Sequence, residues 1–116
     1  MKSIYTEHQT QTQIINFLRI KGWYVMRLNS GKMRYTNSSG KQKFVMLQDP
    51  GTPDIVAFRQ DISLRTVEVG VKLIFIEVKV PGNKPTWLQQ QKMQELEKYG
   101  AKCFVATSVE DVEKLI

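Results

Sequence analysis

Two charged residues interrupt the end of an apolar run in this sequence. Residues 73–80 read Leu-Ile-Phe-Ile-Glu-Val-Lys-Val, so Glu77 and Lys79 flank Val78. A short run of this composition is typical of a strand in a covered sheet. Because side chains alternate between the two faces of a strand, Glu77 and Lys79 are expected on one face, with the aliphatic residues around them against the core on the other. A buried strand has no ordinary structural use for such a pair, so the pair indicates chemistry.

A second carboxylate, Asp54, follows Pro53 upstream of this run. If Asp54 begins a strand that neighbours the 71–80 strand, its side chain reaches the end at which Glu77 lies. Two carboxylates are hard oxygen ligands suited to Mg²⁺, and such a cation activates water and offsets charge in phosphodiester hydrolysis. The alternatives are structural: Asp54 in a turn that begins a strand, and Glu77 with Lys79 as a cross-strand ion pair on a solvent-facing sheet.

The composition indicates the class of protein and of partner. A chain of 116 residues, of which 41% are hydrophobic, predicts one domain over residues 1–116. A formal net charge of +6 and a pI of about 9.6 favour a polyanionic partner such as nucleic acid. The first residues form no apolar signal segment, and no apolar run approaches the roughly 18 residues of a membrane span. No membrane partner is therefore expected, and the expected location is the cytoplasm.

The residues that other common catalytic and metal-binding motifs require are absent from the sequence. The single cysteine, Cys103, excludes an internal disulfide and has no partners for a zinc site, so a small buried apolar role is expected. The single histidine, His8, belongs to no recognisable Ser-His-Asp set and is expected to be a solvated helix residue. The sequence contains no glycine-rich phosphate loop.

The local patterns predict an α/β fold with a mixed central sheet flanked by helices. Thr6 and Gln9 form a possible capping box at the start of a helix that Gly22 ends. The polar, basic segment 30–46 is expected to be an exposed hairpin or arm with a turn at 37–40. In chain order, the expected elements are a helix over 6–21, strands over 23–28, 44–47, 54–58 and 71–80, a loop or ragged strand over 61–69, a helix over 86–99 capped by Thr86, a strand over 101–107, and a helix over 109–116 capped by Ser108.

Four segments resemble the motifs of the VRR-NUC nuclease domain. They are Gly51-Thr52-Pro53-Asp54, Glu77-Val78-Lys79, Lys84-Pro85-Thr86-Trp87-Leu88-Gln89, and residues 104–112, Phe-Val-Ala-Thr-Ser-Val-Glu-Asp-Val. The VRR-NUC family belongs to the PD-(D/E)XK superfamily, which also includes restriction endonucleases and archaeal Holliday junction resolvases. The short chain is similar to the stand-alone VRR-NUC proteins of phages and prophages. The resemblance implies a restriction-endonuclease-like core.

The resemblance also implies a function. A relative of these proteins is expected to be a divalent-metal-dependent DNA endonuclease that is selective for branched DNA such as Holliday junctions, in a bacterial or phage-infected host cell. Cutting two strands usually takes two sites, so a homodimer is expected, with the apolar residues Trp87, Leu88 and Tyr35 as candidates for its interface. The alternatives are a non-catalytic DNA-binding module on the same fold and a sequence-reading restriction-type endonuclease.

The resemblance assigns the metal ligands by position. Asp54 and Glu77 are the expected ligands of Mg²⁺ or Mn²⁺, with the carbonyl oxygen of Val78 as a third. Glu7 matches an additional acidic residue that reaches the metal directly or through water. The alternative for Glu7 is a carboxylate that only complements the helix dipole.

Two further residues receive catalytic roles from the resemblance. Lys79 is expected to act on the attacking water and on the charge of the phosphoryl oxygens. Gln89 is expected to orient the water or a phosphate, although Gln90 and Gln91 follow it directly. The alternative for Gln89 is a solvated helix residue. Trp87 stands where proline is common in relatives.

Basic residues form the candidate DNA contacts. Four lie in the 30–46 segment, where positive side chains are suited to phosphate contacts. The expected DNA-binding residues are Lys32, Arg34, Lys41, Lys43 and, in a later loop, Lys84. The alternative for the segment is a solvated loop.

Overall fold

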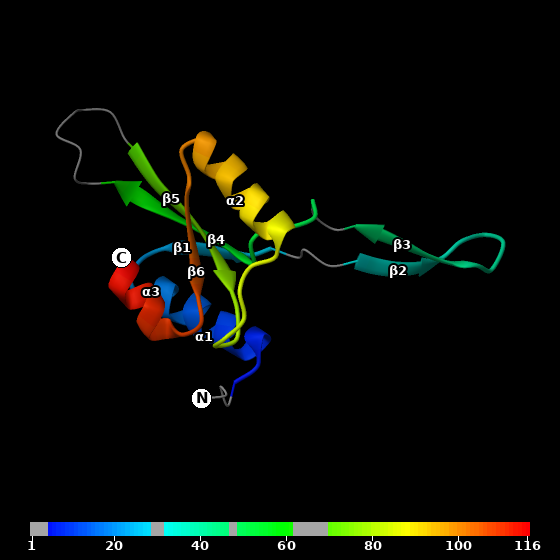
Figure 1. The fold of residues 1–116 in the computed structure, drawn as a ribbon, viewed down its shortest axis with the longest axis horizontal. Coiled ribbons are helices and arrows are strands. Elements are labelled where there is room, and N and C mark those ends of the chain that lie inside the picture. Colours follow the sequence, from blue (N-terminus) through cyan, green and yellow to red (C-terminus); the bar gives the residue numbers. More distant parts are fainter. Residues whose placement is uncertain (1–4, 29–31, 47–48, 62–69) are drawn as a thin grey trace.

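The structure is a computed structural model that describes residues 5–28, 32–46, 49–61 and 70–116. Within these ranges the chain has a mixed α/β architecture (Figure 1). The elements are α1 (Glu7–Ile20), β1 (Tyr24–Arg27), β2 (Lys32–Thr36), β3 (Gln42–Met46), β4 (Ile55–Asp61), β5 (Gly70–Val78), α2 (Trp87–Lys98), β6 (Lys102–Ala106) and α3 (Val109–Leu115). Leu47 and the predicted loop residues 62–69 lie outside the described residues.

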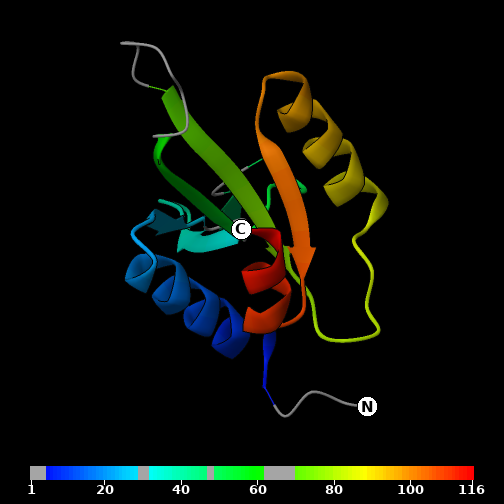
Figure 2. The same ribbon diagram turned by 90° about the vertical axis from the view of Figure 1, so that its left-hand side faces the viewer.

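A four-stranded mixed sheet in the order β1-β4-β5-β6 forms the centre of the fold. β4 pairs antiparallel with both β1 and β5, whereas β6 pairs parallel with β5. Helices α1 and α3 lie on one face of the sheet and α2 lies on the other, beside β6 (Figure 2). The register joins Ile55 to Ile76, so the next position along places Asp54 opposite Glu77.

The core lies between the sheet and helices α1 and α3. Ile14, Ile15 and Leu18 of α1 are buried at helical spacing, so one face of the helix packs on the sheet. Ile76 and Val78 of β5 are fully buried on the same side, as the alternation of β5 predicts. The other buried apolar residues of this cluster are Trp23, Val25, Ile55, Ala57, Ile74, Ala106 and Val112.

Local capping signals determine where the helices begin. Thr6 and Gln9 form the predicted capping box, in which Gln9 N donates to Thr6 Oγ1 and Thr6 N donates to Gln9 Oε1. Thr86 and Ser108 cap α2 and α3, also as predicted. His8 is exposed on α1, as expected for a solvated helix residue. None of the helices in the described ranges is long and apolar enough to cross a membrane.

The segment after β1 forms the predicted hairpin, β2–β3, which projects away from the rest of the fold (Figure 1). Asn37 organises its turn, because its Oδ1 accepts hydrogen bonds from the backbone N–H groups of Ser39 and Lys41. Among the described helices and strands, β2 and β3 contact only each other. The other described helices and strands therefore leave both faces of the hairpin uncovered.

Several predicted strand boundaries differ from the structure. The strand predicted over 54–58 is β4, which continues to Asp61 because Arg59, Gln60 and Asp61 pair with β5. β1 and β6 are each one residue shorter at both ends than predicted, and β5 begins one residue earlier.

The returning strand of the hairpin begins at Gln42 rather than Phe44, because Gln42 and Lys43 pair with Thr36 and Tyr35. The strand predicted over 71–80 ends at Val78. Beyond Val78, Lys79 N still donates to Ala106 O, and the chain then turns, with Asn83 N donating to Val80 O. Lys79 therefore follows the strand end.

Candidate active site

Asp54 and Glu77 meet at one end of the sheet, on the face that α2 covers. Asp54 directly precedes β4, and its Oδ2 accepts a 2.7 Å hydrogen bond from the backbone N–H of Val78. Its own carbonyl accepts a second bond from Leu28 N. Main-chain bonds from the two neighbouring strands thus hold Asp54 next to the end of β5.

Glu77 is buried, with 3% of its surface exposed. Its Oε1 accepts a 3.0 Å hydrogen bond from Gln89 Nε2 and lies 3.7 Å from Lys79 Nζ. Its Oε2 is also buried and receives no hydrogen-bond donor among the described residues, while the Glu77 carboxyl lies close enough to Asp54 to share a proton with it. Burying a carboxylate oxygen without a donor is costly, so a proton or a cation is needed beside Oε2 when the site is satisfied.

Burial is the main cause of the perturbed acidity of both carboxyl groups. Burial raises the pKa of Glu77 to about 8, the charge of Asp54 adds to the rise, and Lys79 opposes it. Burial also raises the pKa of Asp54, against the Val78 N–H bond that lowers it. The charge of Glu7 raises both pKa values. Glu7, in the first turn of α1, is therefore electrostatically part of the site.

Gln89 reaches Glu77 because the start of α2 orients its amide. Gln89 occupies the third helical position after Thr86, and Gln89 Oε1 accepts the Thr86 N–H at 2.8 Å. With its oxygen engaged in the cap, the amide nitrogen is left to donate to Glu77. Gln90 Nε2 instead donates to Pro85 O, and Gln91 is exposed. Among the three consecutive glutamines, the structure brings Gln89 to the carboxylates.

The loop before Asp54 packs directly on the first turn of α2. Gly51 has φ +84°, and a Cβ at this position would lie 2.5 Å from the carbonyl oxygen of Leu88. Only glycine permits both this backbone conformation and this approach. The contact links the loop that carries Asp54 to the helix that carries Gln89.

The sequence patterns did not predict two of these features, the capping box that orients Gln89 and the contact of Gly51 with α2. Thr86-Trp87-Leu88-Gln89 has the same capping-box spacing as Thr6 to Gln9, and this pattern would have placed the Gln89 amide at the helix start. The close approach of Gly51 to α2 has no local signal, because it depends on how a distant helix packs.

The site residues offer oxygen donors to a hard cation. The described part of the chain contains no group of three or more His, Cys, Asp or Glu side chains that could hold a metal ion. The candidate set is mixed: the carboxylates of Asp54 and Glu77, with the Val78 carbonyl as the third donor that the resemblance implies. The unpartnered Oε2 of Glu77 fits such a use, because a divalent cation would satisfy it and replace the proton.

The predicted DNA contacts on the hairpin do not share one face. Arg34 is paired with Phe44 and Tyr35 with Lys43, so the alternation along each strand sends Arg34 and Lys43 to opposite faces. The Arg34 guanidinium lies 5.3 Å from the centre of the Phe44 ring. Arg34, Lys41 and Lys43 are exposed, as is Lys84 in the loop before α2. Lys32 begins β2, but its side chain is outside the described parts.

The residues considered for a dimer interface lie on separate elements. Trp87 and Leu88 are exposed in the first turn of α2, whereas Tyr35 is exposed on the hairpin.

Cys103, expected to be buried, is partly buried between β6 and α2, where its thiol donates to Met93 O at 3.6 Å. Burial raises the pKa of this thiol to about 11, as expected for an unreactive cysteine.

Comparisons of the chain with models of protein families, with curated proteins and with solved structures gave no match.

In EDTA, Glu77→Gln should reduce the pH dependence of the free energy of unfolding. Because the pKa of Glu77 is raised from 4.5 to about 8, the folded chain binds this proton more tightly than the unfolded chain does. The resulting stability is fully present below pH 4.5 and is lost as the pH rises to about 8. We expect the wild type to lose at least about 1 kcal/mol over this window by chemical denaturation. Glu77→Gln should lose less of its free energy of unfolding over the same window, and the exposed control Glu113→Gln should behave like the wild type. If stability falls with pH as steeply in Glu77→Gln as in the wild type, burial of Glu77 does not cause the pH dependence.

Gln89→Glu should separate the two roles of Gln89. Glutamate at this position keeps the capping oxygen but loses the N–H donor and places a carboxylate beside Glu77. At about pH 9, where Glu77 is ionised, we expect a loss of at least about 1 kcal/mol in urea denaturation. Gln9→Glu, at the equivalent position of the α1 capping box, is the matched control and should change stability by less than about 0.5 kcal/mol. Equal effects would show that Gln89 only caps α2.

Proposed function

We propose that this protein is a divalent-metal-dependent DNA endonuclease with a restriction-endonuclease-like core. The observation that carries the proposal is the convergence of Asp54, Glu77, Lys79 and Gln89 at one end of the sheet, around a buried carboxylate oxygen without a donor among the described residues. A mixed sheet with helices on both faces is compatible with that core. The motif resemblance to VRR-NUC nucleases supports the same proposal.

Asp54 and Glu77 would hold Mg²⁺ or Mn²⁺, with the Val78 carbonyl as a further oxygen donor and Glu7 adding negative charge nearby. When bound, the cation would supply Lewis-acid stabilisation of the charge that develops on the phosphoryl oxygens. The raised pKa of Glu77 means that this carboxyl must release its proton before it serves as a ligand. Because the proton and the cation compete for this carboxylate, metal binding should weaken as the pH falls.

Lys79 would act through its charge, and Gln89 would position the Glu77 carboxylate. Lys79 Nζ is partly buried and lies beside Glu77, where its positive charge can stabilise a phosphoryl oxygen or orient the attacking water. Gln89 holds the Glu77 carboxylate in one orientation through an amide that the helix cap already restrains. Hydrolysis joins the water oxygen to phosphorus and breaks the bond to the departing sugar oxygen.

Charge supports DNA as the substrate. The net charge is +6, although carboxylates are concentrated at the proposed centre. Exposed Arg34, Lys41 and Lys43 on the projecting hairpin and Lys84 near α2 would contact phosphates. Selectivity for branched DNA and a two-fold dimer with two cutting sites are parts of the proposal that rest on the resemblance.

A non-catalytic DNA-binding module on the same fold has less support. Carboxylates repel phosphate, and burying Glu77 lowers the stability of the folded chain at neutral pH without helping DNA to bind. A binding module would gain from replacing both acids, whereas a nuclease requires them. A sequence-reading enzyme would cut linear duplexes at defined sites rather than prefer junctions.

Asp54→Ala and Glu77→Ala should abolish metal-dependent cleavage while DNA binding persists. Lys79→Ala should lose at least about a hundredfold in rate, the usual scale for removing a group that acts in the transition state. The assay compares a four-way junction, a flap and a linear duplex with Mg²⁺, Mn²⁺ or excess EDTA. Glu95→Ala, an exposed acid on α2, is the control and should cut like the wild type. Full activity in either carboxylate variant, or cutting in excess EDTA, would refute the metal centre.

Neutralising Arg34, Lys41 and Lys43 to glutamine should weaken DNA binding and flatten its salt dependence. Each lost duplex phosphate contact should lower the slope of log affinity against log salt by about 0.9. A triple variant of exposed Lys21, Lys98 and Lys114 removes the same charge elsewhere and serves as the control. Fluorescence anisotropy over a salt series measures both slopes. If the two triple variants have the same slope, the hairpin does not contact phosphates.

A further inference from the structure

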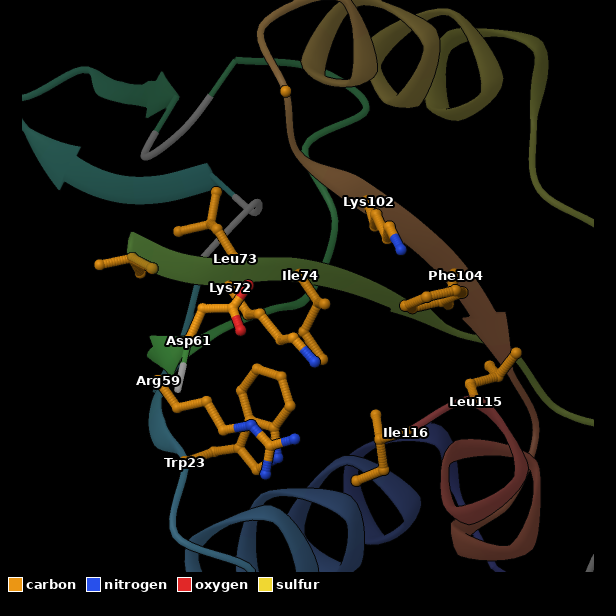
Figure 3. A pocket seen from close by; sticks show the side chains of 12 residues that line it. Trp23, Arg59, Asp61, Lys72, Leu73, Ile74, Lys102, Phe104, Leu115 and Ile116 are labelled. Atoms are coloured by element: carbon orange, nitrogen blue, oxygen red, sulfur yellow. The ribbon is translucent and has the colours of Figure 1, made fainter. Parts of the chain in front are cut away.

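A separate cavity of about 360 Å³ opens on the α1 and α3 face of the sheet (Figure 3). It lies at the end of β4 that carries Asp61, whereas the carboxylate site lies at the opposite end, next to Ile55. The two sites also face opposite sides of the sheet. Nothing in the proposed nuclease chemistry uses this cavity.

Three cations from three neighbouring strands line the cavity. Arg59 of β4 and Lys72 of β5 are direct cross-strand partners, and Lys102 of β6 pairs with Ile74 on the same face. Like charges placed directly opposite each other destabilise a sheet. Asp61 also lines the cavity, so its charged side chains are three cations and one carboxylate, and their net charge is positive. Figure 3 shows these side chains around one hollow. An anion bound between them would relieve the repulsion.

Trp23 lies in the same wall of the cavity. Trp23 lines the cavity with 5% of its surface exposed, and its indole Nε1 meets no hydrogen-bond partner among the described residues. The Arg59 guanidinium lies 4.5 Å from the centre of the Trp23 ring, which restrains this long side chain. Because Nε1 itself is closed off from solvent, Trp23 contributes its ring and the contact with Arg59 to the wall, rather than a donor that faces the cavity.

The rest of the lining is apolar. Ile74 is buried, Phe104 is partly buried, and Leu115 and Ile116 line the side nearest the end of α3. A volume of this size lies within the range of small-molecule sites. The cavity therefore combines a cationic wall with an apolar surface large enough for a compact organic group.

We propose that this cavity binds a small phosphate monoester. The phosphate would lie among Arg59, Lys72 and Lys102, and a planar or apolar body would pack against Ile74 and Phe104. A phosphate monoester carries about −1.5 to −2 charges near neutral pH, which matches the net lining charge better than a single carboxylate does. The proposal does not depend on nuclease activity, because it uses different residues on a different face.

Adenosine monophosphate in EDTA is the test probe, and Trp23 is the reporter. The chain has two tryptophans, so Trp87→Phe leaves Trp23 as the only one, inside the cavity. The probe should change Trp23 fluorescence in a saturable way. Adding Lys72→Gln and Lys102→Gln should weaken binding at least about tenfold, since charge-assisted contacts are lost. Both lysines are exposed, so these variants should fold, which circular dichroism verifies.

The control variant is Lys98→Gln, which removes an exposed lysine at the end of α2 and should bind the probe like the Trp87→Phe parent. Adenosine without phosphate should bind at least about tenfold more weakly than the monophosphate. The proposal would be overturned by the lack of a saturable change below about 10 mM probe. Equal binding of adenosine, or equal losses in the Lys98 control and the double variant, would overturn it as well.

Discussion

The buried carboxyl group of Glu77 is the constraint on which the rest of this end of the molecule depends. One of its oxygens receives Gln89 Nε2 and lies near Lys79, while the other has no donor among the described residues. Moving a carboxylate out of water is costly, and the pKa of about 8 expresses that cost. A strand that retains such a group gives up stability at neutral pH unless a proton or cation compensates it. This is the physical reason to regard the site as functional.

Main-chain interactions position each side chain around Glu77. The Val78 N–H holds Asp54, the Thr86 N–H holds the oxygen of Gln89, and Gly51 lets the Asp54 loop contact the backbone of Leu88. Backbone bonds restrict these groups before any ligand arrives, as preorganised sites require. Alternation of side chains along the strands places the carboxylates and the cationic cavity on opposite faces of the sheet. The two sets also lie at opposite ends of β4 and β5.

Much of the fold could be predicted from the sequence because its signals are local. A capping box at Thr6, a cap at Thr86 and one at Ser108 determine where the helices begin, and hydrogen bonds within a few residues make these signals readable. The turn at Asn37 likewise defines the hairpin. The Glu77 and Lys79 pair was recognisable because two charges in an apolar run contradict the ordinary pattern of a strand. Strand ends were less predictable, since the partner strand determines where pairing stops.

The sequence by itself determined the helices, the hairpin and the candidate chemistry of Asp54, Glu77 and Lys79, whereas only the tertiary structure decided how the groups meet. The resemblance selected Gln89 among three consecutive glutamines, and the packing of α2 against β6 and the Asp54 loop brings its amide to Glu77. The hairpin cations belong to two faces because the cross-strand register, rather than their closeness in the chain, sets their direction. Likewise Arg59, Lys72 and Lys102 have no common sequence pattern. They converge because pairing between strands brings together residues that are distant in the chain, a long-range effect that local patterns do not encode.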